Sequence, residues 1–264
     1  MSDTIIKSTN LTKVYPPDIW ALDNCNIDII REKFISIIGP SGCGKTTFLK
    51  IVAGLEDYQE GDVSFEGQQI LKTTDWKRSV IFQDVRLFPW MTAKENVYFS
   101  LENKGTSKDE IKRISNKWMK MFGIDEFADK YPSEISEGQK QMTATARVLA
   151  LDPPVVLCDE PFSSLDWNTR NMLQRALLKY WDEKKKTVVF VTHDIEEAVF
   201  LSQEVLCMSA RPGKIIETVK IDLPRKRWEV NRTSPKLLKY ASSISDILEE
   251  ELKKGRQLEK KDGY

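Results

Sequence analysis

The chain has 264 residues, which is enough for one large domain or two small ones with a substantial hydrophobic core. Its 40 Lys and Arg residues balance 40 Asp and Glu residues, so no overall basic charge indicates a nucleic-acid partner. The four cysteines and the single histidine lack the spacing of a zinc site or a disulfide framework, a usage typical of a reducing cytosol.

Hydropathy argues against a secreted or membrane-spanning chain. Residues 1–10 contain no apolar run typical of a secretory signal. The longest apolar runs, such as residues 34–38 and 188–191, are far shorter than the ~20 residues that a spanning helix needs. If the protein serves a membrane, we expect it to do so from outside the bilayer.

The first predicted elements surround a glycine-rich loop. Strands are expected at residues 27–30 and 34–38, and the second runs directly into Gly39. A helix is expected from Lys45 to Ala53, ending at Gly54. The intervening sequence GPSGCGKT matches the pattern G-x-x-x-x-G-K-[ST] in the strand-to-helix context that this pattern requires.

This loop predicts a nucleotide site. Its glycines let backbone N–H groups approach phosphates, the Lys45 ammonium would neutralise the β- and γ-phosphates, and the Thr46 hydroxyl would ligate Mg²⁺. The Cys43 side chain could contact the nucleotide or could serve only as a small filler within the loop, and the sequence is equally compatible with both roles. The residues expected to contact nucleotide here are Gly39, Pro40, Ser41, Gly42, Cys43, Gly44, Lys45, Thr46 and Thr47.

Beyond the loop the pattern changes twice. Extended segments are expected at residues 63–65 and 79–82, and the pattern is then helical from Thr92 to Ala150. Afterwards strands and helices alternate, with strands at 155–158, 187–191 and 205–208 and helices at 168–181 and 195–201. This alternation predicts an α/β fold with a parallel sheet, into which residues 92–150 are inserted as a helical subdomain.

A second anion site is predicted at a helix start inside the insertion. Ser136 and Gln139 have the spacing of a capping box. Because a helix start presents unpaired N–H groups and the positive end of the macrodipole, it suits an anion. Glu137 at the first helical position favours the macrodipole but adds negative charge beside that anion.

Two carboxylates follow the buried strand 155–158. Asp159 suits Mg²⁺ held directly or through water, and Glu160 suits a general base that orients the attacking water. Acids at a strand end are also common as solvent-facing caps. Their position downstream of a phosphate loop favours catalysis.

The order of phosphate loop, capped helix and acidic pair resembles the ATPase subunits of ABC (ATP-binding cassette) transporters. In that family the segment matching Ile135–Gln139 reads Leu-Ser-Gly-Gly-Gln and caps the γ-phosphate bound by the partner subunit. The resemblance covers about residues 4–224. It implies a P-loop NTPase (RecA-like) core with an antiparallel β subdomain, ATP and Mg²⁺ as ligands, and two subunits paired head to tail. Glu137 departs from the pattern, and pointing inward it would weaken closure on ATP.

The resemblance also assigns isolated residues. His193 matches the switch histidine that touches the γ-phosphate, although a lone histidine is usually structural. Gln83 matches the glutamine that contacts Mg²⁺ and the attacking water, and Ser163–Asp166 matches the segment that crosses to the partner. Tyr15 would stack on adenine, with Trp20 as a weaker competitor and an edge-strand aromatic as the alternative role.

A complete site would therefore combine residues of two subunits. The first subunit would supply Lys45, Gln83, Asp159, Glu160 and His193. The second would supply contacts to ATP from Ser136, Gly138 and Gln139.

The apolar run Leu87–Met91 follows Gln83 and is either a plug that folds back into the core or a docking patch. Together with Ala210–Ile215 and Asp222–Arg225, it resembles ATPases that serve importers of nitrate, sulfonates, taurine and bicarbonate. That resemblance implies a separate integral membrane permease, indirect action with a solute-binding protein, no nucleic acid, and a place on the cytoplasmic face of the cell membrane.

Residues 225–264 form a predicted extension beyond an ATPase domain of residues 1–224. Pro235 begins its helix and Gly255 is expected to end it. The helix either packs on its own domain or makes a regulatory or dimer contact.

Two other functions fit the sequence less well. Soluble ABC modules of DNA repair or translation usually carry a long coiled-coil insert or two tandem cassettes, and neither fits this length. A small-molecule kinase or GTPase needs no capped helix of this kind, and Asn103–Thr106 lacks the Asp of the guanine-reading pattern N-K-x-D. The resemblance therefore implies an ATP-hydrolysing subunit that energises import of a small solute, with a soluble ABC-type ATPase not coupled to transport as the alternative.

Overall fold

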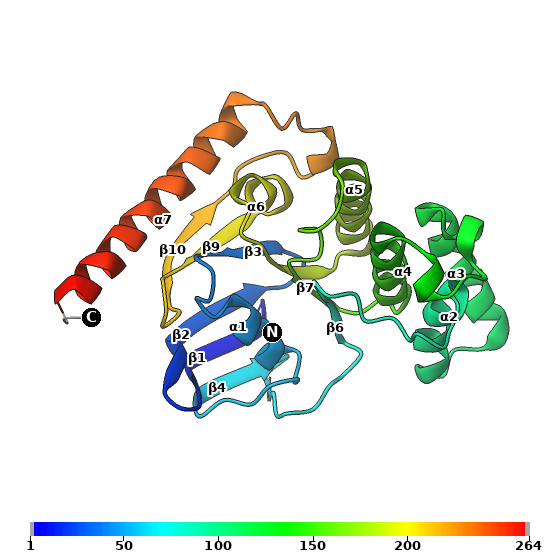
Figure 1. Cartoon of the computed structure of the whole chain (residues 1–264), viewed down its shortest axis with the longest axis horizontal. Coiled ribbons are helices and arrows are strands. Elements are labelled where there is room, and N and C mark those ends of the chain that lie inside the picture. Colours follow the sequence, from blue (N-terminus) through cyan, green and yellow to red (C-terminus); the bar gives the residue numbers. More distant parts are fainter. Residues whose placement is uncertain (1–2, 262–264) are drawn as a thin grey trace.

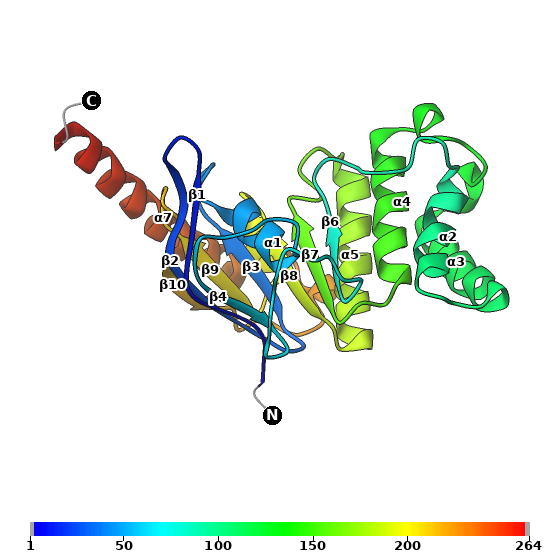
Figure 2. The same ribbon diagram turned by 90° about the horizontal axis from the view of Figure 1, so that it is seen from below.

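The computed structural model describes residues 3–261 and contains two β-sheets with helices between and around them (Figures 1 and 2). The inserted helices lie at one end of the molecule and the C-terminal helix lies at the other. The predicted α/β fold with a helical insertion is confirmed. No helix among residues 3–261 is both long and apolar enough to cross a membrane.

The larger sheet has six strands in the order β10-β9-β3-β8-β7-β6. Their bounds are β3 (Phe34–Ile38), β6 (Arg78–Ile81), β7 (Val155–Asp159), β8 (Thr187–Val191), β9 (Glu204–Met208) and β10 (Ile215–Lys220). Strands β9 to β6 are parallel, and β10 pairs antiparallel with β9. Every residue of β3, β7 and β8 is buried, because helices or the second sheet cover both faces.

The smaller sheet is antiparallel, with the order β2-β1-β4-β5. Its strands are β1 (Thr4–Tyr15), β2 (Ile19–Ile30), β4 (Glu60–Phe65) and β5 (Gln68–Gln69). Helix α1 (Lys45–Val52) lies between the two sheets, where Phe48, Leu49 and Ile51 are fully buried. The smaller sheet therefore covers the helix that follows the phosphate loop.

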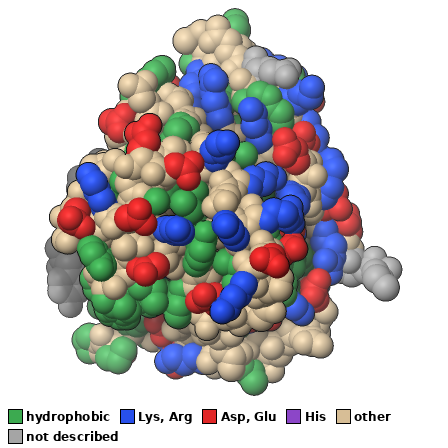
Figure 3. Space-filling model, turned by 90° about the vertical axis from the view of Figure 1, so that its right-hand side faces the viewer, with side chains coloured by type: hydrophobic (Ala, Val, Ile, Leu, Met, Phe, Trp, Pro, Cys, Tyr) green, Lys and Arg blue, Asp and Glu red, His purple; other side chains and the backbone are tan. Residues whose placement is uncertain are grey.

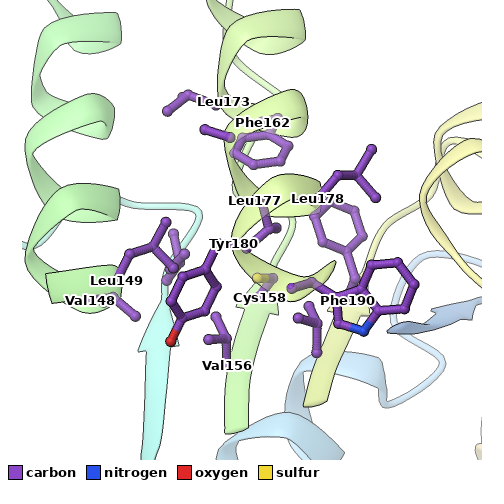
Figure 4. Packing of buried hydrophobic residues seen from close by; sticks show 14 of the residues in the cluster. Val148, Leu149, Val156, Cys158, Phe162, Leu173, Leu177, Leu178, Tyr180 and Phe190 are labelled. Carbon is purple, nitrogen blue, oxygen red and sulfur yellow. The ribbon is translucent and has the colours of Figure 1, made fainter. Parts of the chain in front are cut away.

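On the other face of the larger sheet, α5 (Trp167–Lys184) and α6 (Ile195–Leu201) build a second core with α4 (Glu137–Ala150). Figure 4 shows this packing, in which side chains of α4 and α5 meet those of β7 and β8. Trp181 of α5 is fully buried, packs edge-to-face on Phe34 and donates a 3.0 Å hydrogen bond to the Glu32 carbonyl.

The insertion contains α2 (Ala93–Asn103), α3 (Lys108–Phe122), the short turns η1 (Ile124–Phe127) and η2 (Pro132–Glu134), and α4. The face of the molecule at the insertion carries both basic (Lys and Arg) and acidic (Asp and Glu) side chains (Figure 3). These elements fall within residues 92–150, the range proposed from the sequence for an inserted subdomain.

The C-terminal extension contains η3 (Arg227–Glu229) and α7 (Pro235–Lys261). Leu237 and Ile244 of α7 are buried in the same core as α6, so the first part of the helix packs on its own chain. The prediction that Gly255 ends the helix is wrong, because the helix continues to Lys261. A single glycine inside a long helix costs only about 1 kcal/mol, which the neighbouring turns can absorb.

Candidate functional site

Four predicted site segments follow four neighbouring parallel strands. The phosphate loop follows β3, Gln83 follows β6, Asp159 and Glu160 end β7, and His193 follows β8. Because parallel strands present their carboxyl ends at one edge of the sheet, the topology brings these segments together.

The phosphate loop is closed by its own lysine. Lys45 is only 5 % exposed, and its ammonium donates to the carbonyls of Gly39 at 2.8 Å and Pro40 at 3.0 Å. Gly44 has a φ of +103°, and a Cβ at this position would lie 2.5 Å from the Ala21 carbonyl oxygen. Glycine is therefore required where the loop passes under β2.

A cavity of about 200 Å³ opens beside this loop. It is lined by Tyr15, Ile19, Ala21, Ser41, Gly42, Cys43, Gly44, Lys45, Thr46, Thr47, Glu160 and Arg211. Tyr15 stands in its wall, with the Lys13 ammonium 4.9 Å from the ring centroid. Trp20, the competing aromatic, is 48 % exposed and lies outside this lining.

Cys43 contributes backbone to the cavity but keeps its thiol inside the protein. Its side chain is 1 % exposed and belongs to the core around α1. Burial raises the pKa of the thiol. The side chain therefore acts as the small filler considered from the sequence.

Arg211 is a site residue that the sequence reasoning did not assign. It belongs to the loop after β9, and its Nε donates to the Gly42 carbonyl at 3.2 Å. The Arg211 guanidinium thus contacts the phosphate loop, although 169 positions separate Arg211 from Gly42 in the sequence. The segment Ala210–Ile215 was singled out only for its family resemblance, and it gave no sign of this contact, because the pairing of β9 with β3 brings the two loops together.

Asp159 and Thr46 form an oxygen pair beside the lysine. The Thr46 hydroxyl donates to the Asp159 carboxylate at 2.7 Å. Burial raises the pKa of Asp159, and the Thr46 hydrogen bond offsets part of that effect. A hydroxyl and a carboxylate are hard ligands that suit Mg²⁺, which usually keeps several waters and binds through one or two carboxylates plus substrate phosphates. The pair therefore fits the predicted metal.

Glu160 is turned toward the cavity by its backbone. Its φ of +45° breaks the strand alternation after Asp159, and its N–H donates to the Val191 carbonyl at 2.9 Å. One carboxylate oxygen lies 2.7 Å from Nδ1 of His193. The sequence reasoning assigned both residues but did not foresee this contact. The imidazole itself is 60 % exposed.

Gln83 reaches the site indirectly. Its amide Nε2 lies 3.5 Å from the Ser163 hydroxyl, which donates to the Glu160 carbonyl at 3.1 Å. The adjoining segment ends at Asp166, whose carboxylate caps α5. Trp167, the next residue, is 74 % exposed.

Residues Ile135–Gln139, here called the signature segment, lie apart from the cavity. Ser136 Oγ accepts from the Gln139 N–H at 3.3 Å while Gln139 Oε1 accepts from the Ser136 N–H at 2.9 Å, so both side chains serve the helix cap. Glu137 is 70 % exposed in its side chain and pairs with Lys140 at 2.6 Å. None of these residues, nor Gly138, lines the cavity beside the phosphate loop.

The sequence and the fold were compared with known proteins. The family model described as ABC transporter matches residues 22–163. The chain belongs to the ABC transporter family. This ABC protein is 48% identical over 252 residues to an uncharacterised ABC transporter ATP-binding protein of Methanocaldococcus jannaschii, covering 94% of this chain and 93% of that one. It is 43% identical over 222 residues to an aliphatic sulfonates import ATP-binding protein of Bacillus cereus, covering 84% and 86%.

Solved ABC proteins share the fold. A dimeric ATP-binding cassette in a post-hydrolysis state with ADP and phosphate superposes with a TM-score of 0.75 at 34% identity, covering 83% of this chain and 100% of that one. A Clostridium perfringens protein from an ABC transporter complex gives a TM-score of 0.73 at 27% identity, covering 83% and 89%. The present ABC protein is therefore an ATP-binding subunit with ATPase activity.

Proposed function

We propose that this chain is the ATPase subunit of an importer for a small anionic solute of the sulfonate type, bound to a separate permease at the cytoplasmic face of the membrane. The identity to a sulfonate import protein over most of both chains supports the solute class. The run Leu87–Met91 and an adjoining groove support docking to a permease, and that groove carries the proposal.

In this proposal the described residues divide the hydrolysis between them. Lys45 and the loop N–H groups hold the phosphates, and Tyr15 stacks on the base. Thr46 and Asp159 would hold Mg²⁺, which neutralises charge on the phosphates when bound. Glu160 accepts a proton from the attacking water, and His193 holds that carboxylate in place at 2.7 Å.

A second subunit is proposed to complete the site. Ser136 and Gly138 stand at a helix start suited to phosphate but outside the cavity of their own chain. Glu137 does not oppose this role, because its carboxylate is paired with Lys140. Two copies paired head to tail would put this helix start over the phosphates of the other copy, and the cassette that this fold resembles is itself dimeric.

The proposed permease site, here called the docking groove, is a cavity of about 440 Å³ between the larger sheet and the insertion. Its lining is Trp76, Ser79, Val80, Arg86, Phe88, Phe99, Ser100, Asn103, Lys104, Arg147, Val148 and Leu151. Three of these residues are basic and none is acidic. An apolar segment with flanking acidic residues therefore matches the groove.

The run Leu87–Met91 adjoins the docking groove in a fixed conformation, and its residue Phe88 lines the groove. Asn96 is fully buried, accepts from the Phe88 N–H at 2.8 Å, and donates to the carbonyls of Phe88, Met91 and Thr92. Phe88 packs edge-to-face on Phe99 at 4.7 Å.

The two aromatic residues of this run differ in burial. Phe88 is partly buried, as the plug alternative predicts, whereas Trp90 is 68 % exposed and packs beside Phe88 with the ring centroids 5.5 Å apart. A rigid run with one exposed aromatic anchor beside the groove is suited to binding another protein.

The test separates docking from folding. Trp90→Ser should leave the melting temperature and the basal ATPase rate of the isolated protein unchanged, but should abolish its recovery with membranes of the native cells. Trp20→Ser is the matched control, because Trp20 is also exposed and lies on β2 outside the docking groove. Phe88→Ser should lower the melting temperature as well, because it removes a packed ring.

If Trp90→Ser protein still sediments with membranes, the docking groove is not the permease site. If wild-type protein never associates with membranes, the alternative of a soluble ABC ATPase is favoured. Identifying the chains that copurify with wild-type protein, and the solute that stimulates the complex, tests the transport assignment.

A further inference from the structure

A hydrogen-bonded chain connects the C-terminal extension to the loop that carries His193. We propose that Arg232 is a positioning residue for the Glu160–His193 pair, acting through Gln174, Glu197 and Thr192. This inference rests on the catalytic roles proposed above for Glu160 and His193. It gives residues 225–234 a part in hydrolysis beyond packing.

Every step of this connection, here called the relay, is a direct contact. The Arg232 guanidinium donates to Oε1 of Gln174. Nε2 of Gln174 donates to one oxygen of Glu197 at 2.6 Å, and the Thr192 hydroxyl donates to the other oxygen at 2.6 Å. Gln174, Glu197 and Thr192 are 0 %, 8 % and 2 % exposed, so water does not substitute readily for any partner.

The relay ends on both sides of His193. Thr192 Oγ1 accepts from the Asp194 N–H at 3.1 Å, and the Thr192 N–H donates to the Ile37 carbonyl at 3.3 Å. The Asp194 carboxylate in turn accepts from the Glu197 N–H at 3.0 Å. Residues 192 and 194 are thereby fixed, while the exposed imidazole between them has a hydrogen bond only to Glu160 among the described residues. The position of the ring therefore depends on the backbone that the relay holds.

Arg232 is suited to maintain the relay by charge and by packing. Glu197 is a buried carboxylate, and burial raises its pKa, an effect that the hydrogen bonds from Thr192 and Gln174 and the charge of Arg170 partly offset. The Arg232 guanidinium also attracts Glu197, and its carbon lies 4.0 Å from the centroid of the Phe200 ring on α6. Loss of Arg232 would leave Gln174 Oε1 buried without its donor and Glu197 without this positive charge.

The chain offers a matched control for Arg232. Arg232 and Arg175 both line a cavity of about 670 Å³, but Arg175 donates no hydrogen bond to any described residue. Each arginine places one positive charge on this surface, but only Arg232 is part of the relay. A small displacement of a catalytic group can cost ~10–100-fold in rate.

The experiment uses the full-length protein and measures kcat, KM for ATP, ATP affinity and melting temperature. Arg232→Ala should lower kcat about 10-fold or more, with KM and affinity within about twofold, because the relay orders His193 and not the phosphate loop. Arg232→Lys should recover part of kcat, and Arg175→Ala should match wild type.

A mutant cycle separates positioning from general stability. In a His193→Ala background, Arg232→Ala should have no further effect on kcat, since its action passes through that ring. An equal loss of kcat in both backgrounds, or an unchanged kcat in Arg232→Ala, would overturn the proposal.

Two further variants cover the remaining outcomes. If Arg232→Ala protein does not fold, Thr192→Val can be used instead, because it interrupts the relay at its other end. Thr192→Val should lower kcat at unchanged ATP affinity, and an unchanged kcat would overturn the proposal. Glu160→Gln tests the underlying role separately: if that variant keeps normal turnover, the general base is misassigned whatever Arg232 does.

Discussion

The phosphate loop and the signature segment are both glycine-containing helix starts, yet the chain holds them differently. Lys45 is 5 % exposed and bonded to its own loop, between two sheets and beside a formed cavity. Ser136 is exposed, its hydroxyl is used by the cap, and it lies outside that cavity. The phosphate-loop half of the proposed site is preorganised within a single chain. The signature-segment half is exposed and would be completed only by contact with a second copy.

This difference explains why each half tolerates different sequences. The loop cannot admit a side chain at Gly44 without contact with Ala21. The signature segment accommodates Glu137 in place of glycine for two reasons. The exposed helix start has room for the side chain, and Lys140 forms an ion pair with its carboxylate. We expect the two segments to respond to mutation in correspondingly different ways.

The largest expected effect concerns the preorganised half. Glu160→Gln should keep ATP binding but slow hydrolysis by about 10²–10⁴-fold, because the amide cannot accept the proton of the attacking water. Single-turnover hydrolysis together with equilibrium ATP binding measures both quantities. Near wild-type turnover would show that the proton goes elsewhere.

The second prediction asks whether the two halves come from different copies. Lys45→Ala and Gly138→Asp should each reduce turnover by ~100-fold or more as separate homodimers, by removing or repelling phosphate charge. Mixing the two proteins should restore roughly a quarter of wild-type activity, because half of the dimers regain one intact site. Mixtures no more active than their components would place both halves of each site in one chain.

The smallest expected effect concerns the wall of the cavity. Tyr15→Ala should weaken ATP affinity by ~1–3 kcal/mol, the range for base–aromatic stacking. Trp20→Ala, measured beside it by calorimetry, should have little effect because Trp20 lies outside the lining. The reverse pattern would move the adenine contact to Trp20.

The parallel strands of the larger sheet were predictable because buried parallel strands leave a strong local signal, whereas its largely exposed antiparallel edge strand β10 was not predicted. Residues 155–158 and 187–191 are continuous apolar runs, and the segments after them carry the carboxylates and the histidine. The first strand of the chain was not predicted. Its register against β2 shifts near Leu11 and Lys13, and these irregularities break the alternation on which strand prediction depends.

The contacts missed from the sequence are those made by distant segments. Arg211 meets Gly42 across 169 positions, and Arg232 meets Gln174 across 58. Neither contact has a local signature, because nothing near Arg211 or Arg232 in the sequence indicates its distant partner. The Glu160–His193 contact was also missed, although both residues were assigned, because the left-handed turn at Glu160 has no side-chain signature.

The exposure of Trp167 gives the molecule a built-in optical reporter. Its indole is 74 % exposed and directly follows Asp166, at the end of the segment proposed to meet a second copy. Indole emission shifts to shorter wavelength when the ring leaves water, so pairing of the two copies would register in this residue's fluorescence without any added label. Trp118 and Trp181 are already buried, and replacing the other exposed tryptophans, Trp20, Trp76 and Trp90, by phenylalanine would isolate that signal.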